Sequence, residues 1–321
     1  MQAWRVHRNG EPAEVMRLES TEPPEPAKGQ VTLAVSAANV NFPDALLCRG
    51  QYQITPPLPF TPGVEICGRT EDGRRVITTV ALPHGGFAEY ALADEAALLP
   101  APASLDDAQA AALHIGYQTG WFALHRRAHL QEGETLLVHA AAGGVGSAAV
   151  QLGKAAGARV IGVVGGREKA AVAEGLGCDL VLDRHTDDII AAVKDTTGGR
   201  GADVVFDPVG GDAFTKSARC VAFEGRIVVI GFTSGTVPAP ALSHALVKNY
   251  SILGLHWGLY AAKDPAAVLR CHERLTELAD QGRIAPLVSE RVGLDAAADA
   301  VQRVADGTTT GRVVVVPEGA K

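Results

Sequence analysis

Residues 135–146 read Thr-Leu-Leu-Val-His-Ala-Ala-Ala-Gly-Gly-Val-Gly, an apolar run that leads directly into a turn of alanines and glycines. This order fits the G-x-G-x-x-G turn that joins a strand to a helix in dinucleotide-binding folds. Gly143 takes the place of the second glycine, which lets backbone approach a pyrophosphate. Gly146 takes the place of the third, which lets the helix pack on the strand, and Ala141 replaces the first. A glycine-rich turn in an unrelated α/β fold is the alternative.

The segments on either side of this turn favour the dinucleotide interpretation. A strand is expected at 135–139, an amphipathic helix at 145–156 and a second strand at 159–164. The start of the helix would offer N–H groups and a partial positive charge to phosphate. The turn residues predicted to contact a cofactor are Gly143, Gly144 and Val145.

The end of the second strand indicates which cofactor is preferred. An NAD site places an acid there for the ribose 2′-OH, whereas this chain continues after Val164 as Gly-Gly-Arg-Glu-Lys, with no acid at the tip itself. Basic side chains can instead pair with a 2′-phosphate. Glu168 lies close by, and ordinary solvated charges are the alternative. We predict NADPH, held at this end by Gly165, Arg167, Lys169 and Arg184.

The rest of the chain divides into two kinds of pattern. Up to about residue 115, short strands such as 31–35 and 75–80 alternate with Pro- and Gly-rich turns, which is typical of a β-rich domain. A helix is expected from Ser104. From residue 135 onward, strands and helices alternate, which predicts a parallel sheet covered by helices. The further expected elements are strands at 180–182, 204–206, 227–230 and 312–316, and helices at 168–176 and 266–282.

Composition excludes several classes of protein. The chain has 321 residues, 47% hydrophobic and 20% charged, which is enough for about two packed domains. The net charge of -7 argues against a nucleic-acid or anionic-membrane binder. No apolar run approaches the ~20 residues of a membrane span, and the N-terminus lacks a signal-peptide pattern. The five cysteines form no CxxC pair, so we expect a reducing, cytoplasmic location.

Four further motifs stand outside the glycine turn. They are Val40-Asn41-Phe42-Pro43-Asp44, Gly50-Gln51-Tyr52, Leu58-Pro59-Phe60-Thr61-Pro62-Gly63-Val64-Glu65 and Asp207-Pro208-Val209-Gly210-Gly211. Together with the glycine turn, they make the chain resemble the zinc-free quinone oxidoreductases of the medium-chain dehydrogenase/reductase family, related to zeta-crystallin. The resemblance runs through essentially the whole chain. It implies a GroES-like catalytic domain at 1–118, completed by 259–321, and a Rossmann domain at 119–258, with the active site between them. It also implies NADPH as the hydride donor and a homodimer.

The same motifs favour a site without metal. Zinc-dependent relatives carry a Cys shortly before the aspartate of the first motif and a His before the glutamate of the third, and here these neighbourhoods contain Asn41 and Val64. A catalytic zinc needs three protein ligands. His125 and His129 have helical spacing but lack a third ligand, so a solvated helix end is the favoured interpretation. Without a Lewis acid, reduction of a conjugated carbonyl is favoured over alcohol oxidation.

The resemblance also suggests residues for the reaction. Asn41 would bind the ribose or carboxamide side of the cofactor, and Thr119 would lie near the nicotinamide. Tyr52 takes the place of a proton donor of related enoyl thioester reductases, and a phenol of pKa ~10 can protonate an enolate. An aromatic wall of the pocket is the equal alternative for Tyr52. Asp44 is expected to orient neighbours more than to act as an acid. Two further residues expected near the nicotinamide are Gly231 and Phe232.

These observations predict an NADPH-dependent reductase that passes hydride to a quinone or another conjugated carbonyl acceptor. Reduction of an enoyl thioester or 2-alkenal is one alternative, and an NADPH-binding structural or redox-sensing protein without turnover is another. Residues 250–255 should form the last strand of the sheet, whose apolar edge invites pairing with a second copy unless a C-terminal helix covers it. His256, Trp257 and Tyr260 could border the substrate or a subunit contact.

Overall fold

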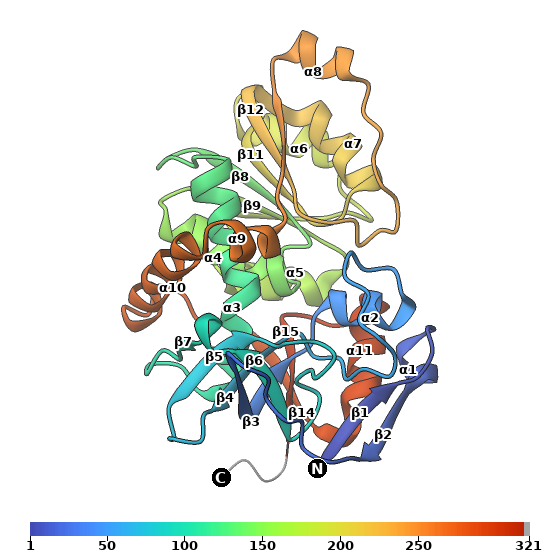
Figure 1. Cartoon of the computed structure of the whole chain (residues 1–321). Helices are drawn as coiled ribbons and strands as arrows, with labels where there is room; N and C mark the ends of the chain where they lie inside the picture. The colour runs from blue at the N-terminus through green and yellow to red at the C-terminus, as the bar shows by residue number, and fades with distance from the viewer. Residues whose placement is uncertain (318–321) are drawn as a thin grey trace. The chain divides into compact units, whose positions relative to one another are not determined.

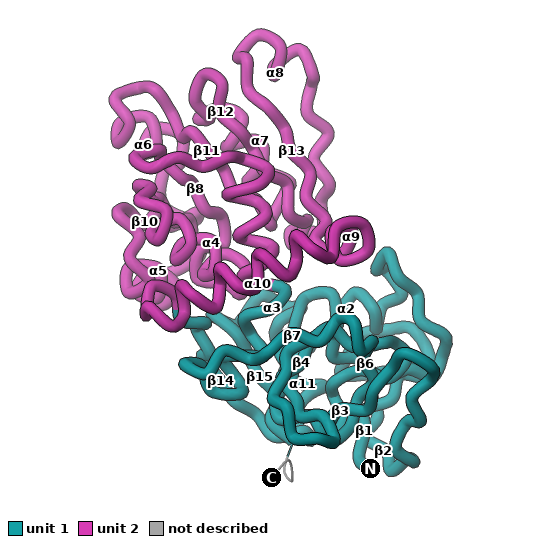
Figure 2. Tube along the Cα trace, turned by 60° about the vertical axis from the view of Figure 1, so that its left-hand side comes forward, with its two compact units in different colours: residues 1–115, 285–321 teal, residues 116–284 magenta. Residues whose placement is uncertain are grey.

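The computed structural model describes residues 1–317, and contacts divide the chain into two compact units (Figure 2). Unit 1 consists of residues 1–115 together with the C-terminal segment from residue 285, and unit 2 consists of residues 116–284. None of the helices in the described part of the chain is both long and apolar enough to cross a membrane.

Unit 2 is built on six parallel strands in the order β10-β9-β8-β11-β12-β13 (Figure 1). This is the 3-2-1-4-5-6 order of a Rossmann sheet, which confirms the predicted parallel sheet. The strands are β8 (Thr135–His139), β9 (Arg159–Val164), β10 (Leu180–Asp183), β11 (Ala202–Asp207), β12 (Val221–Val229) and β13 (Ser251–Gly254). Their apolar side chains pack with those of the helices in a core that includes Leu137, Ile161, Val205, Phe214 and Ile227.

The helices of unit 2 cover both faces of this sheet. Right-handed crossovers direct α4 and α5 to one face and α6 and α7 to the other. The segment between β12 and β13 carries α8 on an arm that projects from the sheet (Figure 1). The helices are α4 (Gly144–Ala155), α5 (Arg167–Gly175), α6 (Ile189–Thr196), α7 (Gly211–Cys220), α8 (Leu242–Lys248), α9 (Trp257–Lys263) and α10 (Pro265–Asp280).

Helix α3 (Asp107–Trp121) runs from unit 1 into unit 2 and continues as a π-helical turn, Phe122–Arg127. It begins later than the predicted start at Ser104. The reason is that the Asp106 carboxylate accepts a hydrogen bond from the N–H of Gln109 at 2.9 Å, which is the geometry of a helix N-cap.

The placement of residues 259–284 differs from the sequence-based division, which put them in the first domain. These residues lie in unit 2. The Tyr260 ring stacks on Phe122 with centroids 4.2 Å apart, and the Arg126 guanidinium pairs with Asp264 at 2.9 Å. Aromatic stacking and an ion pair therefore fix α9 and the start of α10 on the π-helical turn.

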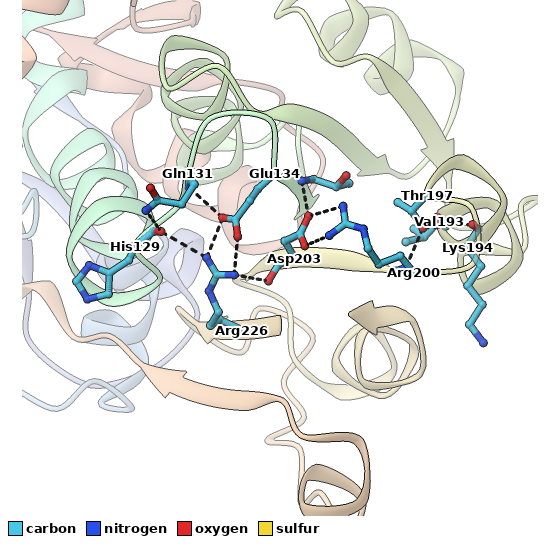
Figure 3. A network of polar contacts seen from close by, with 11 residues as sticks. His129, Gln131, Glu134, Val193, Lys194, Thr197, Arg200, Asp203 and Arg226 are labelled. Carbon is cyan, nitrogen blue, oxygen red and sulfur yellow. Dashed lines mark hydrogen bonds and ion pairs between the residues drawn. The ribbon is translucent and has the colours of Figure 1, made fainter. Parts of the chain in front are cut away.

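Polar contacts join the amino ends of three strands of unit 2 (Figure 3). Arg226 on β12 donates to both carboxylate oxygens of Glu134, at 2.8 and 2.9 Å. Asp203 on β11 accepts from the N–H of Thr135 at 2.8 Å and pairs with Arg200. This network connects the strands at their amino ends. The glycine turn lies at the other end of β8, where the strand leads into α4.

Unit 1 contains a sheet in the order β14-β15-β3-β4-β5-β7, with β6 also paired to β3, and a separate pair β1-β2. This confirms the β-rich N-terminal region. The strands are β1 (Gln2–Val6), β2 (Met16–Ser20), β3 (Gln30–Asn39), β4 (Glu65–Arg69), β5 (Arg75–Thr79), β6 (Tyr90–Asp94), β7 (Leu99–Pro100), β14 (Val288–Gly293) and β15 (Arg312–Val316). The helices are α1 (Pro12–Val15), α2 (Phe42–Arg49) and α11 (Ala297–Ala305), with 3-10 turns at Glu95–Ala97 and Leu294–Ala296.

Strand β15, from the C-terminal segment, is an internal strand of the unit 1 sheet. Strand β15 pairs antiparallel with β3, with Val314 opposite Asn39 and Val315 opposite Ala38. Val315 and Ala38 are fully buried in the core of this unit. The pairing brings β15 beside the residues that lead into α2, where the sequence predicts reactive side chains.

Candidate functional site

The turn after β8 leaves room for a phosphate group. Ala140 has a positive φ of 51°, and the N–H of Gly143 donates to the Ala140 carbonyl at 2.8 Å. A Cβ on Gly146 would lie 2.0 Å from the same carbonyl oxygen, so only glycine fits there. No side chain among residues 1–317 caps α4, which starts at Gly144. The first N–H groups of α4 therefore face the turn, as an anion site requires.

A pair of cations lies at the carboxyl ends of β9 and β10. The Arg184 guanidinium covers Gly165, where an added Cβ would lie 2.7 Å from the Arg184 Cζ. Burial, and then the positive charge of Arg184, lower the pKa of Lys169. Two neighbouring cations repel each other, and a bound anion removes that repulsion. The structure thus places Arg184 over Gly165, and Lys169 is near enough to interact electrostatically with both Arg184 and Glu168.

Arg167 and Glu168 are exposed in the first turn of α5. The acid of this region that the sequence analysis did not consider is Asp183, at the end of β10. Hydrogen bonds from the N–H groups of His185 and Gly166 lower the pKa of Asp183. This carboxylate binds the backbone just before α5, which carries Lys169, and just after Arg184.

The loops after β11 and β12 contact each other at the carboxyl ends of these two strands. The Asp207 carboxylate accepts from the N–H groups of Val209 and Gly210, both at 2.9 Å. Phe232 packs over Gly210, whose Cβ would lie 2.8 Å from the ring. Phe232 itself is partly exposed, and Gly231 precedes it, two residues after the end of β12. Gly231 and Phe232 therefore lie at the carboxyl end of the sheet, which is where a Rossmann fold binds its dinucleotide.

Thr119 is buried near the end of α3. Its neighbour Gln118 accepts a hydrogen bond from the Trp257 indole at 2.9 Å, and Tyr260 stacks on Phe122. Trp257 and Tyr260, whose roles the sequence left open, thus pack within unit 2.

In unit 1, the Asp44 carboxylate organises the start of α2. One oxygen accepts from the N–H of Asn41 at 2.8 Å, and the other from the N–H groups of Gly63 and Val64 at 2.9 and 3.1 Å. Burial raises the pKa of Asp44 to about 7, and these hydrogen bonds oppose the rise. Asp44 is fully buried. It therefore connects two loops, which agrees with an orienting role.

Asn41 belongs to a buried network in unit 1. The Arg312 guanidinium donates to Asn41 Oδ1 at 2.9 Å, and Asn39 Nδ2 donates to the same oxygen at 3.3 Å and to Glu65 Oε1 at 2.7 Å. The N–H of Ile115 donates to Glu65 Oε2 at 2.9 Å. Burial raises the pKa of Glu65 to about 7, opposed chiefly by the charge of Arg312.

Tyr52 is partly buried and packs against the core of unit 1. Burial and the charge of Asp44 raise the pKa of its phenol. A phenol in this environment keeps its proton at neutral pH. Both interpretations of Tyr52 fit this position.

Comparison with known proteins adds the family. The family model described as zinc-binding dehydrogenase matches residues 144–274. The chain is also 38% identical over 297 residues to the quinone oxidoreductase-like protein 2 homolog of Nematostella vectensis, an alignment that covers 89% of this chain and 81% of that protein. The chain belongs to the quinone oxidoreductase family. The resemblance seen in the sequence motifs is thereby confirmed.

Solved structures show the same architecture. The Escherichia coli quinone oxidoreductase complexed with NADPH matches with a TM-score of 0.91 at 28% identity, over 99% of this chain and 100% of that one. A probable oxidoreductase from Mycobacterium abscessus matches with a TM-score of 0.89 at 36% identity, over 99% of both chains. The match to the Escherichia coli quinone oxidoreductase confirms the GroES-like and Rossmann fold class. The family model does not extend over Asn41 or Val64, because it matches residues 144–274 alone.

Some contributors to the site were missed by the sequence analysis. Arg312 and Asn39 carry the network around Asn41, and Ser217 binds His139 just before the glycine turn at 2.7 Å. A sequence signal existed for Arg312, because it is a charge that opens an otherwise apolar strand.

Proposed function

We propose that this protein is an NADPH-dependent oxidoreductase that reduces a quinone or another conjugated carbonyl acceptor without a catalytic metal. One observation carries the cofactor preference. The glycine turn before α4 and the Lys169–Arg184 pair both lie at the carboxyl ends of the parallel strands of unit 2. The turn suits a pyrophosphate, and the two cations suit a 2′-phosphate. Membership of the quinone oxidoreductase family supports the reaction class. When bound, NADPH supplies the hydride, and the protein supplies position and electrostatics.

The donor atoms support the metal-independent part of this proposal. Asn41 and Val64 stand where zinc-dependent relatives carry Cys and His. Within residues 1–317, no three His, Cys, Asp or Glu side chains gather as a metal site would require. All five cysteines are unpaired, which agrees with the proposed cytoplasmic location.

The proposed function is tested by following NADPH consumption with a para-quinone, an enone and an enoyl thioester. We expect the quinone to be reduced fastest, and NADH to be a poorer donor than NADPH. Fastest turnover of the thioester or enone would establish the alternative reductase. NADPH binding without turnover of any acceptor would favour the non-catalytic alternative.

Tyr52→Phe should lower enone turnover by roughly 100-fold or more while sparing quinone turnover and NADPH affinity. Hydride addition to an enone creates an enolate that must be protonated, and the phenol of Tyr52 can donate that proton. A quinone gives a stable hydroquinone anion that water can protonate. The measurement is kcat/KM for both acceptors with purified Tyr52→Phe protein. Equal losses with both would assign Tyr52 to the pocket wall, and no loss would assign protonation to solvent.

We also propose a homodimer formed through unit 2. Strand β13 lies at the edge of the six-stranded sheet, which confirms its prediction as the last strand, and Ile252 on it is partly exposed. The arm beside it carries three apolar side chains of α8 that are 76–78% exposed, namely Leu242, Leu246 and Val247. A second copy would bury this apolar surface.

Leu246→Glu combined with Ile252→Lys should convert a dimer into a monomer, because both changes place charge in the proposed interface. Light scattering at micromolar concentration measures the change in mass. Leu269→Glu is the matched control, since Leu269 is an exposed leucine on α10 outside this surface. A monomeric mass for the unmodified protein would contradict the proposal.

A further inference from the structure

A buried polar contact joins the end of β8 to helix α7 within unit 2. His139 is the last residue of β8, and its Nε2 lies 2.7 Å from the Ser217 hydroxyl on α7. The same hydroxyl lies 2.8 Å from the Ala213 carbonyl oxygen, one helical turn earlier. His139 is 2% exposed and Ser217 is fully buried. Both hydrogen bonds are therefore shielded from water.

The chemistry of the three groups sets the direction of both hydrogen bonds. A backbone carbonyl only accepts, so the single hydroxyl hydrogen of Ser217 goes to Ala213. The Ser217 oxygen then accepts from His139, whose Nε2 must carry a hydrogen. This assigns the Nε2–H tautomer to His139, a choice that atomic positions alone leave open.

His139 is neutral in this position at neutral pH. Burial lowers the pKa of its imidazole, and the positive charge of Lys216 lowers it further. The carboxylates of Asp207, on the neighbouring strand β11, and Asp212, on α7, oppose this shift. The imidazole therefore stays uncharged at and above its usual pKa of 6.5, with one N–H for the Ser217 oxygen.

The glycine turn is held on two sides. His139 leads directly into it, and the N–H of Ala141 in the turn donates to the Val163 carbonyl of β9 at 3.1 Å. Backbone thus connects the turn to β9, on one side of β8. The His139 side chain connects the same turn to α7, which follows β11 on the other side of β8.

Helix α7 extends this connection to two further loops. It begins at Gly211, just after the turn that the Asp207 carboxylate organises. The N–H of Gly211 donates to the Thr236 carbonyl at 3.1 Å, in the loop after β12 that also carries Phe232. The contact between His139 and α7 thus couples the glycine turn to the loops expected near the nicotinamide.

We propose that His139 and Ser217 are positioning residues: their hydrogen bond holds the glycine turn at a fixed spacing from α7, so that this turn and the loops after β11 and β12 bind one dinucleotide together. The inference rests on the proposed function, because it takes NADPH as the ligand. A site whose parts are held in place before binding loses less free energy to ordering the protein. Both side chains act through the backbone that they fix.

Ser217→Ala removes the hydroxyl and should raise the dissociation constant of NADP+ by about tenfold, the value of a typical hydrogen bond. Adenosine 2′-monophosphate is the matched probe, because it carries the phosphate expected at Lys169 and Arg184 but lacks the pyrophosphate. Its dissociation constant should stay within about twofold. Calorimetric titration measures both constants. An unchanged NADP+ affinity, or an equal loss for both probes, would overturn the inference.

A double variant separates positioning from stability. Ser217→Ala leaves the buried His139 N–H without an acceptor, which destabilises a folded protein. His139→Leu combined with Ser217→Ala removes both partners and should recover part of the thermal stability. NADP+ should still bind about tenfold more weakly to this double variant than to the unmodified protein. If NADP+ affinity recovers together with the melting temperature, the contact is merely structural and the inference is wrong.

Thr197→Val is the matched control for the loss of a hydroxyl in unit 2. The Thr197 hydroxyl donates to the Val193 carbonyl at 2.7 Å and accepts from the N–H of Gly201 at 2.8 Å, near the amino end of β11 (Figure 3). We expect Thr197→Val to lower the melting temperature and to leave NADP+ affinity unchanged. A loss of affinity equal to that of Ser217→Ala would show that any destabilisation of unit 2 weakens binding, which would overturn the inference.

The tautomer of His139 can be measured without a ligand. In protein labelled with 15N-histidine, its signals are assigned by their loss in His139→Leu or their shift in Ser217→Ala. We expect the neutral Nε2–H form at and above pH 6.5. The Nδ1–H form or an imidazolium would overturn the assigned contact. Failure of the unmodified protein to bind NADP+ or NADPH would instead count against the proposed function itself, and the tautomer would still test the contact.

Discussion

The double variant Lys169→Glu, Arg184→Glu should lose most of its preference for NADPH over NADH. Each charge-assisted hydrogen bond to a phosphate contributes roughly 1.5–3 kcal/mol, with Arg184 at the lower end because it is exposed. Loss of two such bonds, with two added negative charges, should raise the NADPH dissociation constant by about 100-fold or more. The NADH constant should change little. Fluorescence titration with both cofactors measures the effect.

Arg167→Glu is the matched comparison for this variant. Arg167 is exposed at the start of α5, whereas the structure brings Lys169 and Arg184 together beside Gly165. We therefore expect a smaller change for Arg167→Glu. The double variant changes the net charge twice as much as Arg167→Glu does. If Arg167→Glu changes the free energy of NADPH binding by half as much as the double variant, overall charge rather than a defined phosphate site sets the preference.

Asp44→Ala should lower the free energy of unfolding by about 3–5 kcal/mol. The substitution removes the acceptor of three buried backbone N–H groups, those of Asn41, Gly63 and Val64. Each buried donor left without a partner costs about 1–3 kcal/mol. Denaturant unfolding followed by circular dichroism measures the loss.

Asp44→Asn is the control for this prediction. Its retained oxygen can still accept from Gly63 and Val64, so it should be less destabilising than Asp44→Ala, although its NH2 group would face the N–H of Asn41. If both variants cost less than about 1 kcal/mol, water must satisfy these N–H groups and Asp44 would not organise the loops.

Local sequence was sufficient where the structure depends on neighbouring residues. The glycine turn could be predicted because the steric demand on Gly146 comes from the Ala140 carbonyl, six residues earlier. The lack of an acid at the tip of β9 and the basic residues Arg167 and Lys169 just beyond it likewise stand within a short stretch. The apolar segment at 250–255 was likewise enough to predict β13 as the last strand.

Long-range partners could not be predicted in this way. Arg312 opens the apolar strand β15 and resembles an ordinary charge at a strand end, yet it binds Asn41 across 271 positions of sequence. The apolar stripe of α10 shows that the helix is buried on one side but not which unit buries it. That is decided by the stacking of Tyr260 on Phe122 and the pair between Arg126 and Asp264.

The two units differ in when they can be completed during synthesis. Unit 2 is one continuous piece of chain, whereas unit 1 needs both the first and the last part of the protein. Domains generally fold as units while the chain emerges from the ribosome. The dinucleotide-binding unit can therefore form while the C-terminal residues are still being added. Strand β15 and Arg312 can join β3 and Asn41 only after residue 316 has been added, so the buried network around Asn41 in unit 1 forms later than unit 2 can fold.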